Sequence, residues 1–163
     1  MEWWGKGRVA VSCNYHTGEW ATFDGGSQDG SLSLGLIAEQ RIWGPVDEAG
    51  EQEDQGVYVF GQYGHGDSVV NAVEHQLGFG VVWLGPIASR SDDVVGAYVS
   101  FVDLSDEAGA GFTEDETSAE IFYQIQLTPA ISLTPDVQYV WTPGGDPTID
   151  DALVLQVRLT VDF

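Results

Sequence analysis

The chain has 163 residues, of which 26 are Asp or Glu and 5 are Lys or Arg, so its formal net charge is −21. Such an acidic chain lacks the basic patch of a nucleic-acid-binding protein and the polybasic segment that anionic lipids attract, which excludes both functions. Its single cysteine, Cys13, excludes an internal disulfide and a metal site with several cysteine ligands. There is no run of about 18 apolar residues, so no transmembrane helix is expected.

Segments of alternating apolar and polar residues follow one another along the chain, separated by stretches rich in Gly and acidic residues. Alternation with a period of two gives a segment one apolar and one polar face, which predicts β-strands. In chain order we expect strands near residues 7–16, 31–43, 56–65, 71–84 and 93–104. The 56–65 segment has the weakest pattern, because Tyr58 and Phe60 lie on the face opposite its valines.

The last three segments alternate most clearly, near residues 120–128, 131–141 and 153–163. From Leu153 to Phe163 every odd position is apolar and most even positions are polar. A tight turn at 128–130 separates the first two of these segments, and a longer turn at 143–147 precedes the last. The apolar face of all three segments carries no charge.

The sequence therefore predicts one all-β domain over residues 1–163, with about eight antiparallel strands in up-and-down order. A soluble β-sandwich would show the same alternation. Strands of about ten residues, however, span a bilayer when tilted, and a lipid-facing Lys or Arg costs about 2–4 kcal/mol, so membrane barrels avoid one. Trp43, Trp83 and Trp141 near strand ends also suit an interfacial girdle. These features favour a transmembrane β-barrel.

The stretch Tyr123–Val140 is similar to the penultimate hairpin of carbohydrate-selective porins of the OprB type. Residues 143–145 and 151–155 continue the resemblance with the spacing that this family shows, and residues 15–18, 38–43 and 56–61 look like earlier strands of the same half. Phe163, which ends the last strand, resembles the C-terminal signal that outer-membrane barrels present to the barrel assembly machinery.

The resemblance implies an outer-membrane porin, a passive diffusion channel for carbohydrates that makes and breaks no bond and needs no cofactor or metal. Its partners would be carbohydrate solutes, outer-membrane lipid and the assembly machinery, with a homo-oligomer as a further option. With the apolar faces turned to lipid, polar and charged residues line the pore: Arg8, Glu39, Arg41, Glu120, Gln124, Gln126, Asp136, Gln138, Gln156 and Arg158. Such groups exchange hydrogen bonds with neutral polyols. A structural alternative for Asp136 and Arg158 is an ion pair between neighbouring strands.

Members of this family carry a signal peptide and have roughly twice as many strands, whereas Met1–Gly5 does not begin like a signal. A closed barrel of eight strands would be filled by its own side chains. An open one would expose edge N–H and C=O groups to hydrocarbon, at several kcal/mol each. We therefore expect an N-terminally truncated chain that forms the C-terminal portion of a larger barrel, or a piece that pairs with another copy.

If Phe163 lies at the periplasmic end, residues 103–116 and 143–150 face outward from the cell. The connections at 84–93 and 128–131 are then periplasmic, as is 44–55, which is unusually long and acidic for such a turn.

Two other classes of function are open to this sequence. A soluble or secreted β-sandwich would use the acidic residues between Asp103 and Glu116 to bind carbohydrate or calcium, although their spacing fits no calcium loop. For an enzyme, His16, His65 and His75 form no metalloprotease motif, and the Gly-x-Ser-x-Gly elbow is absent. A carboxylate pair for glycoside hydrolysis depends on distances in space, which sequence does not give.

Overall fold

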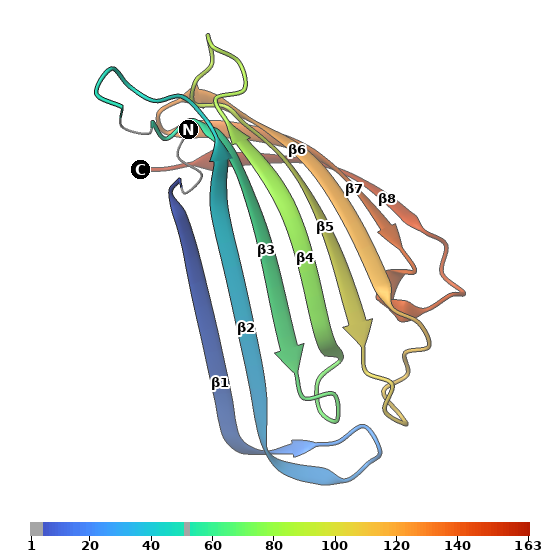
Figure 1. Ribbon diagram of the computed structural model, residues 1–163. Coiled ribbons are helices and arrows are strands. Elements are labelled where there is room, and N and C mark those ends of the chain that lie inside the picture. Colours follow the sequence, from blue (N-terminus) through green and yellow to red (C-terminus); the bar gives the residue numbers. More distant parts are fainter. Residues whose placement is uncertain (1–4, 51–52) are drawn as a thin grey trace.

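The computed structural model describes residues 5–50 and 53–163. Eight strands form a single antiparallel sheet in sequence order (Figure 1): β1 (Gly7–Ala21), β2 (Ser27–Trp43), β3 (Gly56–Gly66), β4 (Val73–Leu84), β5 (Val94–Leu104), β6 (Glu116–Thr128), β7 (Ile131–Trp141) and β8 (Ala152–Val161). A short 3-10 turn, η1 (Pro143–Gly145), lies between β7 and β8. No helix in the described ranges is long and apolar enough to cross a membrane. The predicted all-β, up-and-down order is confirmed.

The strands lie where the alternation predicts them, but β1 and β2 are longer than expected, with 15 and 17 residues. An irregularity in their register between His16 and Glu19 lets pairing resume beyond the predicted end of β1. Figure 1 shows the far ends of these two strands bending away from the line of the sheet. A bulge of this kind adds a local kink without ending the strand.

The register places most apolar side chains on one face of the sheet, which we call the outer face, and most polar side chains on the other, the inner face. The row Ile121, Val137 and Leu155 crosses β6, β7 and β8 on the outer face, with 64%, 47% and 72% of each residue exposed. No hydrophobic side chain among the described residues is buried. The buried side chains are polar, and Ser100, Ser132, Thr134 and Asp136 of the inner face are among them.

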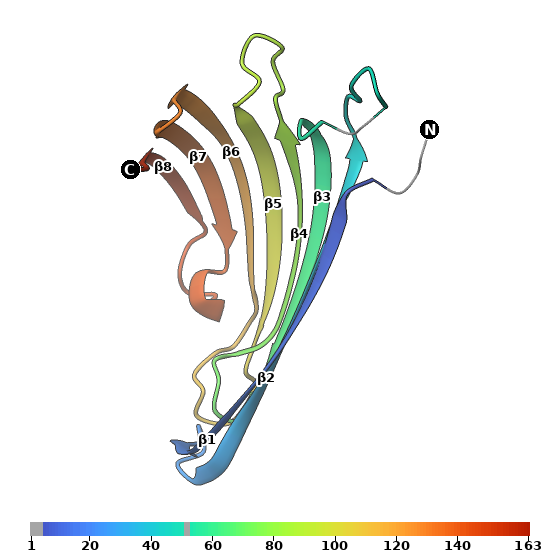
Figure 2. The same cartoon turned by 90° about the vertical axis from the view of Figure 1, so that its left-hand side faces the viewer.

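This distribution is the reverse of a soluble β-sandwich, whose apolar faces are packed against each other. In the described part of the chain a single sheet is present, and nothing covers its apolar face. The sheet is curved but open (Figure 2), because β1 pairs only with β2 and β8 only with β7. Within residues 5–50 and 53–163, the apolar faces of the last three strands are therefore not packed against a second sheet.

The connections collect at two ends of the sheet. One end holds the connections 44–55, 85–93 and 129–130 together with the C-terminus, at the top of Figure 1. The other end holds the connections 22–26, 67–72, 105–115 and 142–151. Backbone hydrogen bonds tie the connections of this second end together: Phe23 N–H to Val69 O at 3.1 Å, Ser105 N–H to Ala72 O at 2.9 Å and Thr113 N–H to Gly145 O at 3.2 Å. The connections are thus held as a continuous rim.

Candidate functional site: the inner face of the sheet

One register row crosses the inner face from β1 to β7, each residue opposite the next: Arg8, Glu39, Phe60, Gly80, Tyr98, Glu120 and Gln138. Four of these, Arg8, Glu39, Glu120 and Gln138, are predicted pore-lining residues. The structure brings these four into a single row. It also places two aromatic side chains between the two carboxylates.

The β1 end of this row holds an ion pair. Arg8 Nη2 lies 3.3 Å from Glu39 Oε2, and their side chains are 70% and 30% exposed. A pair this open to solvent contributes at most about 1 kcal/mol to stability, so it orients the groups more than it stabilises the fold. Glu39 keeps its second oxygen for other donors.

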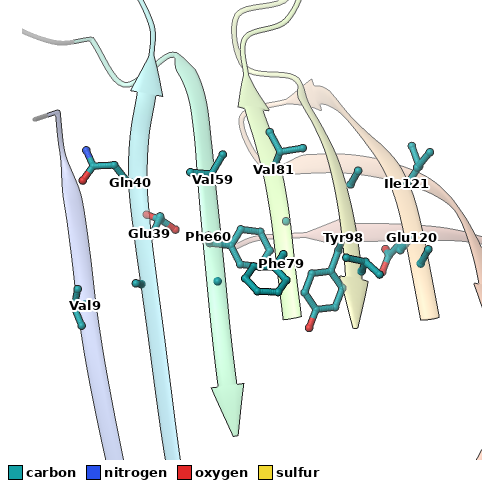
Figure 3. Close-up of a pocket in the computed structure, with 16 residues that line it drawn as sticks. Val9, Glu39, Gln40, Val59, Phe60, Phe79, Val81, Tyr98, Glu120 and Ile121 are labelled. Carbon is teal, nitrogen blue, oxygen red and sulfur yellow. The ribbon is translucent and has the colours of Figure 1, made fainter. Parts of the chain in front are cut away.

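The centre of the row holds the rings of Phe60 and Tyr98. Their centroids are 5.7 Å apart and their planes differ by 12°. The Tyr98 hydroxyl accepts a hydrogen bond from Gln62 Nε2 on β3, so the side chain of Tyr98 reaches across β4. Figure 3 shows both rings over the sheet, Phe60 reaching from β3 towards β4 and Tyr98 from β5.

The rings occupy space that β4 leaves empty. A Cβ atom on Gly80 would collide with the Phe60 ring, and one on Gly78 would collide with the Tyr98 phenol. Phe122 of β6 covers Gly96 of β5 in the same way. Glycines on β4 and β5 thus let aromatic side chains from neighbouring strands lie close to the backbone of the inner face.

A second polar group lies on β7 and β8. Asp136 is 4% exposed; its Oδ1 accepts a hydrogen bond from Gln138 Nε2 at 3.0 Å, and its Oδ2 has no protein partner. Gln156 is opposite Asp136, while Arg158 is opposite Thr134. The ion pairs of the described residues do not include Asp136 with Arg158, so the structural alternative for this pair is not observed.

Arg41 lies on the same face but serves a loop. It is 6% exposed, and its Nη2 donates to Pro45 O at 2.8 Å and Gln55 O at 3.0 Å. These two bonds hold the ends of the long 44–55 connection together. Arg41 therefore anchors this connection instead of offering a free guanidinium to a solute.

Gln124 and Gln126 lie at the end of β6, beside the turn formed by residues 85–93. The backbone N–H of Gln126 donates to Asp93 Oδ1 at 2.9 Å, and Asp93 also accepts bonds from the Arg90 guanidinium and the Tyr123 hydroxyl. Asp93 is 1% exposed. Hydrogen bonding to the Arg90 guanidinium, followed by that to Tyr123 and Gln126, holds the pKa of the Asp93 carboxyl well below its usual range. This carboxylate is a structural anchor between β5 and β6.

Several acidic and histidine side chains elsewhere hold the connections together or stack on one another. Across residues 5–50 and 53–163, no cluster of three His, Cys, Asp or Glu residues could hold a metal ion. Asp115 and Glu116 accept bonds from the backbone of Leu104 and Gly144 and so tie neighbouring connections together. His65 stacks on His75, with ring centroids 4.9 Å apart, at one end of the outer face.

The aromatic residues of the inner face were not among the predicted pore-lining residues. Phe60, Tyr98 and Phe122 occupy positions where the alternation calls for a polar side chain. Because of Phe60, the 56–65 segment has a weak strand pattern. The feature that could have indicated them is that each of these aromatic residues has a glycine near it on an adjacent strand, namely Gly78, Gly80 or Gly96. That signal needs the register, which the sequence alone does not supply.

The chain matches the family model described as carbohydrate-selective porin, OprB family, over residues 8–163. Porin B of Pseudomonas aeruginosa is 22% identical over 148 residues, which cover 78% of this chain and 32% of that protein. The structure of Pseudomonas putida OprB at high pH superimposes with a TM-score of 0.82 and 20% identity, over 96% of this chain and 44% of that one. The chain thus spans less than half the length of these relatives. With a family match that runs almost from end to end, the chain belongs to the carbohydrate-selective porin family of the OprB type.

Proposed function

We propose that this chain forms part of the wall of an outer-membrane channel through which carbohydrates diffuse passively. The observation that carries the proposal is the separation of the two faces. The outer face exposes apolar side chains such as Leu36, Val137 and Leu155, while polar and charged side chains gather on the inner face. A lipid-exposed outside and a polar inside are the arrangement of a water-filled barrel.

Further strands must complete such a barrel. The free edges of β1 and β8 present N–H and C=O groups that would each cost several kcal/mol in hydrocarbon. The chain corresponds to 44% of the solved Pseudomonas putida structure, which leaves room for about as many strands again. In this proposal residues 1–163 are the C-terminal portion of the barrel, and pairing with a second copy is the other way to close it.

Selectivity in this channel comes from the inner face. Arg8, Glu39, Glu120 and Gln138 share one row with Phe60 and Tyr98, so solute hydroxyl groups find both donors and acceptors there. Asp136, Gln156 and Arg158 extend the polar lining on β7 and β8. The channel binds and releases solutes along this lining without chemical change.

The orientation follows from the two ends of the sheet. We place the end with Phe163 in the periplasm, where this fully exposed side chain is accessible to the barrel assembly machinery. The interlocked connections 22–26, 67–72, 105–115 and 142–151 then form the rim on the outer side of the cell. The long connections 105–115 and 142–151 then face outward, as is usual in such barrels, while the connection 44–55 is an unusually long periplasmic one.

Liposome swelling tests this function on the full-length gene product. The protein is refolded in detergent and inserted into vesicles, and swelling is followed with sugars of increasing size. We expect swelling that slows as the sugar grows, together with a steady ion conductance in planar bilayers. A full-length protein that is soluble without detergent, or vesicles that swell no faster than protein-free ones, would rule the function out.

A further inference from the structure

The inner-face pair Phe60 and Tyr98 is built from three strands. Phe60 comes from β3 and Tyr98 from β5, and both rings fill space above β4, where Gly80 and Gly78 carry no side chain. If the space above β4 on the inner face needed only to be filled, side chains of β4 itself could fill it. Instead, two glycines at alternate positions of β4 admit two nearly parallel rings from its neighbours. Both rings remain partly exposed on the polar face.

Polar groups border the two rings on several sides. Glu39 is opposite Phe60, and Glu120 is opposite Tyr98, so an acidic residue flanks the aromatic pair on each side along the row. The Tyr98 oxygen accepts the bond from Gln62, and no protein acceptor for its own hydrogen is present among the described residues. The aromatic pair is therefore flanked by two residues whose carboxylates accept hydrogen bonds, and it carries one hydroxyl donor of its own.

We propose that Phe60 and Tyr98, with Glu39 and Glu120 beside them, form a binding subsite for one neutral pyranose ring in the channel. The C–H face of a pyranose is flat and apolar, and it packs against an aromatic ring, whereas its hydroxyl groups point outward around the rim. Carboxylates accept hydrogen bonds from such hydroxyl groups, and charge-assisted bonds of this kind are the stronger ones. This inference rests on the proposed function and adds a location and a preferred class of solute, cyclic sugars over acyclic polyols.

The comparison of glucose with sorbitol isolates the aromatic contribution. Both are neutral and rich in hydroxyl groups, but only glucose offers a ring face. Binding is measured on the full-length protein as the sugar-induced reduction of ion current through single channels in planar bilayers. We expect Phe60→Leu and Tyr98→Leu each to weaken glucose binding by about three- to tenfold, which corresponds to the loss of an aromatic contact of about 0.7–1.4 kcal/mol, while sorbitol binding stays within about twofold.

The matched control is Phe79→Leu, which removes an aromatic ring from the outer face of β4. It should leave the current reduction by both solutes unchanged. A second pair of variants acts through the backbone. Gly80→Ala introduces a methyl group into the Phe60 ring position, whereas the added methyl of Gly64→Ala, also on the inner face, comes no closer than 3.8 Å to Gln76. We expect only Gly80→Ala to weaken glucose binding.

The outcomes separate this inference from the function beneath it. If the unmodified protein passes sugars but Phe60→Leu changes glucose and sorbitol binding equally or leaves both unchanged, the subsite is wrong and the channel stands. If the unmodified protein conducts neither ions nor sugars, both fail. Resistance to trypsin, measured for every variant, shows that the altered proteins are folded, so unchanged or equal binding in a folded variant overturns the subsite.

Discussion

Replacing Val137 by arginine tests whether the outer face meets lipid. Val137 lies near the middle of β7, is 47% exposed, and has Ile121 and Leu155 as its register neighbours. An arginine that faces lipid near the bilayer midplane costs about 2–4 kcal/mol. On a face that meets water, the same substitution would leave the arginine solvated and change the free energy of unfolding by only about 0.5 kcal/mol. The change in the free energy of unfolding is therefore expected to be several times larger if Val137 faces lipid than if it faces water.

The matched control is Gln138→Arg, one residue along the strand and on the inner face, opposite Glu120. We expect Val137→Arg to lower the free energy of unfolding by about 2–4 kcal/mol and Gln138→Arg to change it by less than about 1 kcal/mol. Urea titrations of the full-length protein in lipid vesicles, followed by tryptophan fluorescence, measure both values. Equal effects of the two substitutions would refute the assignment of the faces.

Three further experiments probe the two faces of the sheet and the side chains that anchor its connections. Cys13, exposed on the outer face of β1, should resist a membrane-impermeant maleimide in vesicles, whereas Ser12→Cys in a Cys13→Ser background should react; labelling of both would contradict the face assignment. Asp93→Asn should lower the urea midpoint at neutral pH, while Asp92→Asn, at an exposed position, should not. Because folding lowers the pKa of Asp93, its stabilising contribution is present above the unfolded pKa of about 4 and is lost only as the pH falls through the lower folded pKa. The difference between the unmodified protein and Asp93→Asn should therefore persist at pH values near 4 and shrink in stronger acid, and a difference that vanishes above pH 4 would contradict this. Arg41→Met should make the 44–55 connection sensitive to protease without changing the strands, as seen by peptide mapping.

The strands could be predicted from the sequence because alternation is a local property. From Leu153 to Phe163 each residue's face follows from its own position, and β8 lies within two residues of the predicted bounds. The extension of β1 beyond His16 could not be predicted in this way. It depends on an irregular register with β2, which restores pairing after the alternation has broken down.

Only some residues of the inner face, and not all of their roles, could be predicted from the sequence. Glu39 and Glu120 were predicted to line a pore because a charged side chain on a membrane-spanning strand is too costly on the face that meets lipid. Arg41 also lies on the inner face, yet its guanidinium donates hydrogen bonds to loop carbonyls 4 and 14 residues away in the sequence. Phe60 is apolar and still belongs to the inner face, because Gly80 on the adjacent strand β4 leaves room for its ring. Both exceptions arise from partners that are distant or on another strand.

The location of the aromatic pair makes it independent of how the barrel is closed. Phe60 and Tyr98 come from β3 and β5, while the open edges are β1 and β8. Additional strands joined to those edges change the width of the lumen but leave the contacts of both rings with β4 unchanged. In the proposed channel the opposite wall would therefore set the size of sugar that can pass, whereas the wall formed by β1–β8 would set which face of the sugar is held. A chimera that keeps β1–β8 and takes its remaining strands from a relative should then show a new size limit and retain its preference for glucose over sorbitol. A chimera with the new size limit but no such preference would show that the opposite wall is needed for binding as well.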